Sequence, residues 1–335
     1  MRAFEATLRD PLKYGFINGR ITYLETKLLT PHQVERLIEA GNLEEALRSL
    51  AETDYGRVFE EVPEEVVVER NLMGYLKEVF DSLEKDCPDK ELFYYFRLKY
   101  DFQNLKTALK LRLTGESGDT FSLLGNYRAE ELSSLVLEER YQELPEPCRG
   151  SAVDAVARYE ETKNPQQIDI LLDRAYFTEL ARVSRGKKRD FIISLTTTLI
   201  DLANLKMFLR ARILQKTRGF LEGYFIDGGE IQKKELLSLF DQEGARVIEH
   251  FRGTDYYHLV RGGFERGLSF LEVIINDFVA QKIAEFKYLI IGPEPVLRYL
   301  LLKENEVRMV KLILLGKIWS IPKDRLRAQL REMYV

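Results

Sequence analysis

Hydrophobic residues recur three and four positions apart along most of the chain, among lysines, glutamates and arginines. That spacing is the helical period, while the alternation typical of strands is scarce and prolines number only 10. The pattern predicts an all-α fold. The clearest helix runs from about Asp190 to Leu214, and its apolar stripe comprises Leu195, Leu199, Leu202, Leu205, Leu209 and Ile213. Its other face, with Lys206, Arg210 and Arg212, is left for water or a partner.

One helical segment is written three times. DFQNLKTALKLRL begins at Asp101, DLANLKMFLRARI at Asp201 and, more faintly, EVRMVKLILLGKI at Glu306, so the copies start 100 and 105 residues apart. Their apolar positions correspond, with Leu105, Leu205 and Val310 at the same place in the register. Such recurrence is typical of structural repeats, and it predicts that these three side chains are buried at equivalent places in superposable units.

Polar positions of this motif correspond too. An acid opens each copy, a lysine follows five residues later, and an asparagine stands between them in the first two copies, where the third has Met309. Because they recur once per copy, we interpret these residues as structural rather than as paired catalytic acids. The predicted structural set is Asp101, Asn104, Leu105, Lys106, Asp201, Asn204, Leu205, Lys206, Glu306, Val310 and Lys311.

Further matches extend the repeat beyond one helix. Tyr75 and Tyr176 lie in similar helices 26 and 25 residues ahead of the first two acids. The tripeptide Thr-Asp-Tyr occurs at 53–55 and 254–256, in both cases roughly 50 residues ahead of a motif helix. Breaks containing Gly and Asp separate the copies. The sequence therefore predicts three similar helical units, at residues 1–118, 119–219 and 220–335.

The motifs of common catalytic and metal sites are missing from the sequence. It contains no G-x-x-x-x-G-K-[ST] and no G-x-G-x-x-G after a strand, and Gly262, Gly263 and Gly267 are better explained by a turn or a close helix contact. His32, His250 and His258 form no H-E-x-x-H motif and no pairing with cysteine. We therefore expect no catalytic residue, no metal site and no cofactor.

Charge, cysteine content and hydropathy indicate which partners and which compartment to expect. With 50 Lys and Arg against 54 Asp and Glu, the net charge is only -4, so no overall field favours nucleic acid or anionic lipid. The two cysteines, Cys87 and Cys148, suit a reducing cytosol. No segment approaches the roughly 18 uninterrupted apolar residues of a spanning helix, which predicts a soluble chain without direct membrane insertion.

A basic run interrupts the second unit. Arg185, Lys187, Lys188 and Arg189 lie between the Tyr176 helix and the helix that carries Asp201, near the tip of an expected hairpin. Such a run is usually a solvated loop. It could also contact acidic or polar loops of a partner, and both interpretations stay open.

Several motifs in order resemble the family of C subunits of V/A-type rotary ATPases, whose eukaryotic members are called d. The segment Tyr299 to Leu330 resembles the family's closing segment, with K-E-x-E followed by an L-x-x-I-x-x-G-K element, and the D-x-x-N-L-K pair matches as well. The opening segment, Phe16 to Leu29, keeps Asn18 and Arg20 of the pattern Y-x-N-A-R-V-R, while Phe16, Gly19 and Thr22 depart from it.

This resemblance implies a non-catalytic central-stalk subunit whose three units form a pseudo-threefold funnel. The funnel would hold the base of the stalk subunits D and F and bind the proteolipid rotor ring (c/K/L-type), which places it in the cytoplasm, peripheral to the membrane. Two alternatives stay open: a helical-repeat scaffold for other partners, although solenoid repeats are usually only about 20–45 residues long, and an all-α metal-dependent enzyme.

Overall fold

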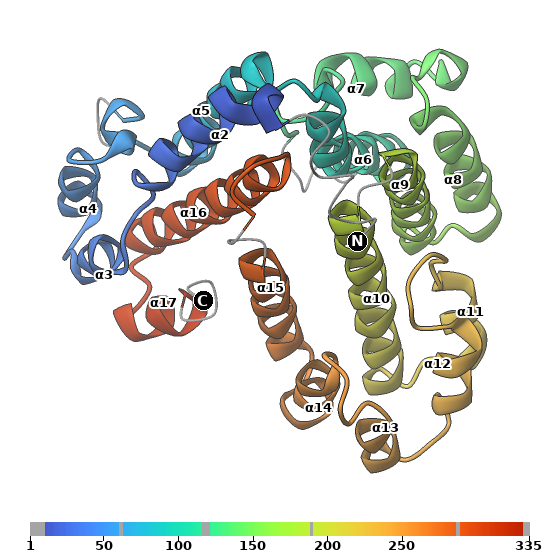
Figure 1. The fold of residues 1–335 in the computed structure, drawn as a ribbon. Coiled ribbons are helices and arrows are strands. Elements are labelled where there is room, and N and C mark those ends of the chain that lie inside the picture. Colours follow the sequence, from blue (N-terminus) through green and yellow to red (C-terminus); the bar gives the residue numbers. More distant parts are fainter. Residues whose placement is uncertain (1–10, 60–62, 116–120, 188–189, 286–288, 331–335) are drawn as a thin grey trace. The chain divides into compact units, whose positions relative to one another are not determined.

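The computed structural model describes residues 11–59, 63–115, 121–187, 190–285 and 289–330. Within these ranges the chain forms helices and loops and no strand, which confirms the all-α prediction (Figure 1). The helices divide between two compact bodies. Body 1 comprises Met1–Phe93 and Asn276–Val335, and body 2 comprises Tyr94–Ile275.

Body 1 brings the two ends of the chain together. It contains α2 (Pro11–Glu25), α3 (Pro31–Glu39), α4 (Leu43–Leu50), the short 3-10 helix η1 (Asp54–Arg57), α5 (Glu65–Asp86), the beginning of α6 (Lys90–Thr114), the end of α15 (Leu268–Glu285), α16 (Glu294–Ile318) and α17 (Lys323–Leu330). The long helix α16 packs on α5, α2, α4 and α17, so a C-terminal helix completes the core of the N-terminal ones (Figure 1).

Local signals fix the helix ends in this body. Thr30 accepts a hydrogen bond from the backbone of Gln33, whose side chain returns one to Thr30 by accepting from its backbone N–H, and this capping box begins α3. Asn42 caps α4 by accepting a hydrogen bond from the backbone N–H of Glu45.

Body 2 holds the remaining helices in chain order. These are the rest of α6, α7 (Ala129–Leu137), η2 (Tyr141–Glu143), α8 (Cys148–Thr162), α9 (Gln166–Lys187), α10 (Asp190–Ile213), α11 (Arg218–Tyr224), α12 (Lys233–Leu239), α13 (Gly244–His250), α14 (Tyr257–Arg266) and most of α15. Helix α10 packs against α9, α11 and α14.

Helix α10 ends within a residue of its predicted limits but is buried more widely than predicted. Of the predicted stripe, Leu195, Leu202, Leu205 and Leu209 lie in the core, whereas Leu199 is half-buried and Ile213 is 37% exposed at the helix end. Ile200 and Phe208, off that stripe, are also fully buried. By length and hydropathy α10 could cross a membrane, although no such segment was expected from the sequence. However, 61% of its apolar window is buried inside the protein, as in the core helix of a soluble protein.

The predicted explanation of the clustered glycines is confirmed. A Cβ on Gly263 would lie 2.7 Å from the end of the Leu209 side chain, so α14 approaches α10 closely here and a larger residue would displace Leu209. Gly267 ends α14 with φ of 84°, a conformation that glycine adopts without strain.

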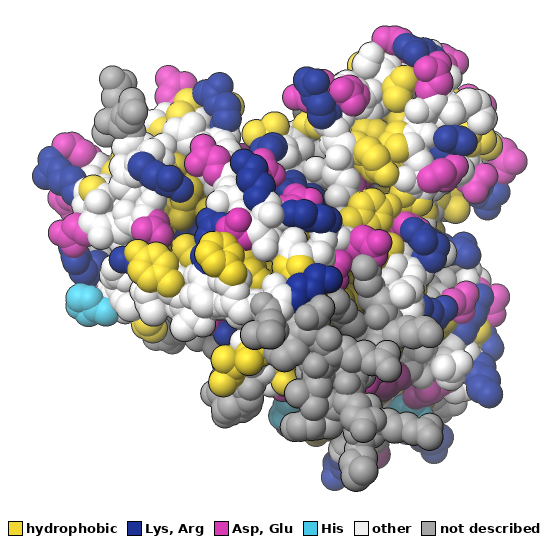
Figure 2. Space-filling view, turned by 45° about the horizontal axis from the view of Figure 1, so that its top comes forward, with side chains coloured by type: hydrophobic (Ala, Val, Ile, Leu, Met, Phe, Trp, Pro, Cys, Tyr) yellow, Lys and Arg dark blue, Asp and Glu magenta, His cyan; other side chains and the backbone are white. Residues whose placement is uncertain are grey.

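Acidic and basic side chains are interspersed over the face drawn in Figure 2, with hydrophobic side chains between them. This mixture agrees with the small net charge of -4. No field of one sign covers this face.

Candidate functional site

The three copies of the motif lie on α6, α10 and α16. Leu105, Leu205 and Val310, which share one register position, are each 0% exposed. The acids that open the copies are also buried, at 0% for Asp101, 0% for Asp201 and 3% for Glu306. Buried acids cost free energy unless they are hydrogen-bonded, so their partners decide what the motif does.

Asp101 holds the loop that follows its own helix. Its carboxylate accepts hydrogen bonds from Asn126 Nδ2 at 2.7 Å and from the backbone N–H of Tyr127 at 3.1 Å. Burial raises the pKa of Asp101 to about 6, although these bonds and the nearby Arg97 guanidinium act to lower it. A Cβ on Gly125 would lie 2.5 Å from Asp101 Oδ1, so the loop needs glycine at this point.

Asp201 repeats this arrangement in α10. It accepts hydrogen bonds from the backbone N–H groups of Glu230 and Ile231, both at 3.0 Å, and from the Tyr256 hydroxyl at 2.9 Å. Burial again raises the carboxyl pKa. Gly229 stands where Gly125 stands in the first copy, since its Cβ would lie 2.0 Å from Asp201 Oδ1.

Glu306 holds its surroundings differently. It accepts a hydrogen bond from the backbone N–H of Leu29, one at 2.8 Å from the Tyr55 hydroxyl and one at 2.6 Å from Lys303 Nζ. Lys303 is 1% exposed, and its ammonium lies 4.7 Å and 5.0 Å from the ring centres of Tyr55 and Tyr75. The third copy therefore contains a buried ion pair.

Burial and charge act in opposite directions on that lysine. Burial alone would lower the pKa of Lys303, and the adjacent Glu306 carboxylate and Tyr75 outweigh it, so the pKa lies above the ordinary lysine value. Burial and Glu306 together hold the pKa of Tyr55 well above its usual range. The ammonium is therefore charged and the phenol neutral at physiological pH.

The repeated tripeptide serves these acids. Tyr256 donates to Asp201, on the motif helix before it, and Tyr55 donates to Glu306, which is 251 residues later in the chain. Sequence spacing relates each tripeptide to the motif helix that follows it. In the structure Tyr256 instead binds the acid of the motif helix before it, and Tyr55 binds the acid of the last motif helix, because the N-terminal helices α2 and α4 pack on α16.

Asparagines provide a second link between helix and loop. Asn104 exchanges two hydrogen bonds with the backbone of Ser122, at 2.9 and 2.7 Å, and Asn204 does the same with Ile226, at 2.8 and 2.9 Å. The third copy has Met309 instead. In body 1 a comparable pair forms between Asn18 and the backbone of Gly292, with both bonds at 2.9 Å.

The motif lysines face outward from the acids. Lys106 pairs with Asp173 on α9, and Lys311 pairs with Glu69 on α5. Lys206 is half-buried on α10. In the first and third copies the lysine thus joins the motif helix to a long neighbouring helix.

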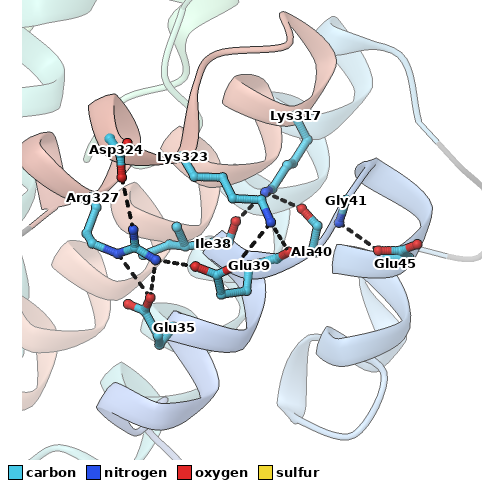
Figure 3. A network of polar contacts seen from close by, with 10 residues as sticks. All are labelled: Glu35, Ile38, Glu39, Ala40, Gly41, Glu45, Lys317, Lys323, Asp324 and Arg327. Atoms are coloured by element: carbon cyan, nitrogen blue, oxygen red, sulfur yellow. Dashed lines mark hydrogen bonds and ion pairs between the residues drawn. The ribbon is translucent and has the colours of Figure 1, made fainter.

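Basic side chains from the C-terminal end of α16 and from α17 bind the carbonyl and carboxylate groups of α3 (Figure 3). Lys317 Nζ donates to the backbone carbonyls of Ile38 and Ala40 at 2.5 and 2.6 Å, which terminates α3. Lys323 pairs with Glu39, and Arg327 pairs with both Glu35 and Glu39.

The glycine before Lys317 has an equally structural reason. A Cβ on Gly316 would lie 2.4 Å from Leu326, so α17 packs directly on the backbone of α16. The glycine–lysine pair of the closing segment thus joins helices. Phosphate binding is not needed to explain it.

The basic run is only partly described. Arg185 is exposed near the end of α9, Lys187 is the last residue of that helix, and Lys188 and Arg189 lie outside the described residues. The role of these residues as a partner contact stays a prediction.

Within the described ranges, no group of three His, Cys, Asp or Glu side chains could hold a metal ion. His32, His250 and His258 are exposed, and His250 lies 2.8 Å from Glu235. Both cysteines are buried and free, and burial raises the pKa of the Cys148 thiol to about 12, which disfavours a reactive thiolate.

Sequence reasoning misses two residues of these cores. From the sequence, Lys303 is recognised only as the first residue of K-E-x-E. Its spacing of three residues from Glu306 on a helix could have suggested the ion pair. Asn18 enters it only as part of the opening pattern. No sequence signal connects it to Gly292, 274 residues away.

Comparisons with known proteins agree on one family. The model of the ATP synthase (C/AC39) subunit family matches residues 17–329. The A-type ATP synthase C subunit of Methanocaldococcus jannaschii is 28% identical, over 96% of this chain and 87% of its own length. The V-type sodium ATPase C subunit of Enterococcus hirae is 24% identical, over 96% of this chain and 99% of its own length. The A-type ATP synthase C subunit of Pyrococcus abyssi is 23% identical, over 90% and 85%.

Proposed function

The chain belongs to the ATP synthase (C/AC39) subunit family, and we propose that it is the non-catalytic socket that couples the D–F shaft to the proteolipid rotor ring. The observation that carries the proposal is the family match across residues 17–329, together with relatives named as C subunits that align over almost the whole chain. As a family member it is a subunit of a membrane-associated rotary ATPase.

The polar cores support a mechanical role. Asp101, Asp201 and Glu306 are each occupied by hydrogen bonds from the loops and helices around them. These bonds tie distant segments to the three motif helices, and packed interiors transmit strain because they are hardly compressible. A torque adaptor needs such stiffness and no reactive group.

Three similar units, at residues 1–118, 119–219 and 220–335, would form a pseudo-threefold funnel around the shaft. Support comes from the motif written three times and from the buried acid in each copy. In this proposal the subunit stays in the cytoplasm and reaches the membrane only through the ring, without nucleic acid or cofactor. The basic run from Arg185 to Arg189 is proposed as a contact with a partner.

Separate binding assays test the proposal. The purified chain should bind a purified D–F stalk and, in a second experiment, the detergent-solubilised proteolipid ring. It should neither bind nor hydrolyse ATP. Failure to bind either assembly would exclude the socket and favour a scaffold for other partners, and metal-dependent turnover of any substrate would favour an enzyme.

A further inference from the structure

Two surface grooves are lined by residues from corresponding places in the repeat. In body 1 one lies between α5 and the end of η1, and in body 2 one lies between α8, α9 and α11. Six positions that line the first recur 100 residues later in the second, which is also the offset from Asp101 to Asp201. In the first groove these positions are Arg57, Val58, Val67, Arg70, Asn71 and Gly74. The two grooves therefore occupy corresponding places beside the first and second motif copies.

The grooves also share one charged pair each, although at different positions. In the first groove Arg57 lies 3.9 Å from Glu78. In the second Arg158 lies 2.9 Å from Glu161. The groove volumes are about 850 and 430 Å³, within the range of protein pockets that hold ligands. Each groove thus has room for a short segment beside a fixed ion pair.

Each groove contains, in addition, one arginine and one acid whose side chains have no hydrogen-bond or ion-pair partner among the described residues. These are Arg70 and Glu64 in the first groove and Arg174 and Asp154 in the second, and all four are exposed. Single unpaired charges are common at protein surfaces. The recurrence of the same set in two corresponding grooves indicates that both bind the same kind of ligand, one that offers a carboxylate to the arginine and a cation to the acid.

A glycine opens each groove. A Cβ on Gly74 of α5 or on Gly223 of α11 would meet nothing within 4 Å, so packing inside the protein does not require either glycine. Glycine in the interior of a helix such as α5 is less favourable than alanine by roughly 1 kcal/mol. The missing side chains leave space for an inserted segment.

Two matching grooves suit a partner that offers the same element more than once. An asymmetric shaft presents a different surface on each side, whereas a ring of identical subunits presents the same loop repeatedly. Exposed ion pairs contribute only about 0–1 kcal/mol each, so one groove alone would hold a loop weakly. Two loops of one ring, bound in two grooves, would together bind far more tightly than either alone.

From these observations we propose that the groove with Arg70 and Glu64 and the groove with Arg174 and Asp154 each receive a polar loop of the proteolipid ring. The loop carries both an acid and a base. The inference rests on the proposed function, in which this ring is a partner. It adds where the ring binds and which charges its loops must offer.

Charge reversal tests the two grooves separately. Detergent-solubilised proteolipid ring and purified D–F stalk are titrated in turn with wild-type chain, Arg70→Glu, Arg174→Glu and the double variant. Each single variant should lose affinity for the ring by about tenfold or more, and the double variant should lose more than either. Affinity for the D–F stalk and the melting temperature should not change, because neither arginine has a partner to lose within the described chain. Arg325→Glu, at an exposed arginine of α17 outside both grooves, is the matched control and should bind the ring like the wild type.

Unchanged ring affinity in both single variants would overturn the inference, and so would a loss in only one of them, because the grooves would then not act alike. An equal loss in Arg325→Glu would overturn it by showing a general effect of charge. A loss confined to the D–F stalk, to vesicles of anionic phospholipid or to self-association would overturn it by identifying another occupant. A wild-type chain that does not bind the ring would instead refute the proposed function, so the two failures are distinguishable.

Discussion

The acids of the second and third motif copies both hold neighbouring segments in place, but they accept hydrogen bonds from different kinds of donor. Asp201 in body 2 is held by two backbone N–H groups, which a glycine turn brings to it, and by a tyrosine hydroxyl. Glu306 in body 1 is held by a buried lysine, a tyrosine hydroxyl and a single backbone N–H. The second site is closed by a loop next in sequence, whereas the third is closed by the opposite end of the chain. The third site therefore has the longer acid Glu306 and the buried Lys303 where the segments that complete it are far apart in the sequence.

The largest expected difference concerns the ion pair. Glu306→Gln leaves Lys303 buried without its counter-charge and should destabilise the protein by about 3–5 kcal/mol. Asp201→Asn removes an acceptor from neutral donors and should cost less, about 1–3 kcal/mol. Urea unfolding of both variants measures the difference.

The double variant Lys303→Met/Glu306→Gln is the control for Glu306→Gln. Removing the unpaired charge should recover most of the lost stability. Equal losses for Glu306→Gln and Asp201→Asn would contradict the distinction between the two sites.

The shared register can be tested at its apolar positions. Leu105→Ala and Leu205→Ala should each cost about 2–5 kcal/mol, because both side chains are fully buried and leave cavities. Val310→Ala should cost less because fewer carbon atoms are removed. A negligible loss at either leucine, measured by denaturant unfolding, would break the equivalence of the first two copies.

The first copy offers a test by pH. Because the folded pKa of Asp101 is about 6, against 3.8 ordinarily, its contribution to stability is complete below about pH 3.8 and is lost as pH rises through about 6. Asp101→Asn removes this dependence. The wild type should therefore gain about 1–3 kcal/mol over the variant between pH 7 and pH 4. A stability difference independent of pH would show that the folded protein leaves this carboxyl unperturbed.

The smallest expected effect lies at the surface pairs. Lys106→Met and Lys311→Met remove the partly exposed bridges to Asp173 and Glu69, and each should cost less than about 1 kcal/mol. Because exposed charges are screened, about 1 M NaCl should reduce both losses. Exposed pairs of this kind are expected to contribute about 0–1 kcal/mol. A loss above about 2 kcal/mol at only one of the two lysines would therefore show that the first and third copies use this lysine differently.

The sequence predicted the helical period far better than the contacts between segments. The period located α10 to within a residue and identified Leu105, Leu205 and Val310 as core positions. It could not identify Tyr127 or Ile231 as donors to the motif acids, because a loop amide carries no sequence signal of its partner.

The contacts between the two ends of the chain in body 1 could not be predicted from the sequence for a related reason. Spacing along a linear chain relates Tyr55 to the motif helix that follows it, whereas the fold places Tyr55 on Glu306 through packing of the two chain ends. The pairs Arg298–Glu25 and Lys311–Glu69 lie across the same junction, each with its base on the C-terminal side. Each residue type was visible in the sequence, but the pairing depends on tertiary structure.

The central claim is that the chain couples rotation to ion transport without catalysing a reaction. Its most direct test is ATP-driven ion uptake by vesicles reconstituted with the rotary complex, with and without this chain. We predict that the complex lacking it hydrolyses ATP in its soluble head but transports no ions, and that adding the chain restores uptake. Full ion uptake in its absence would contradict the account.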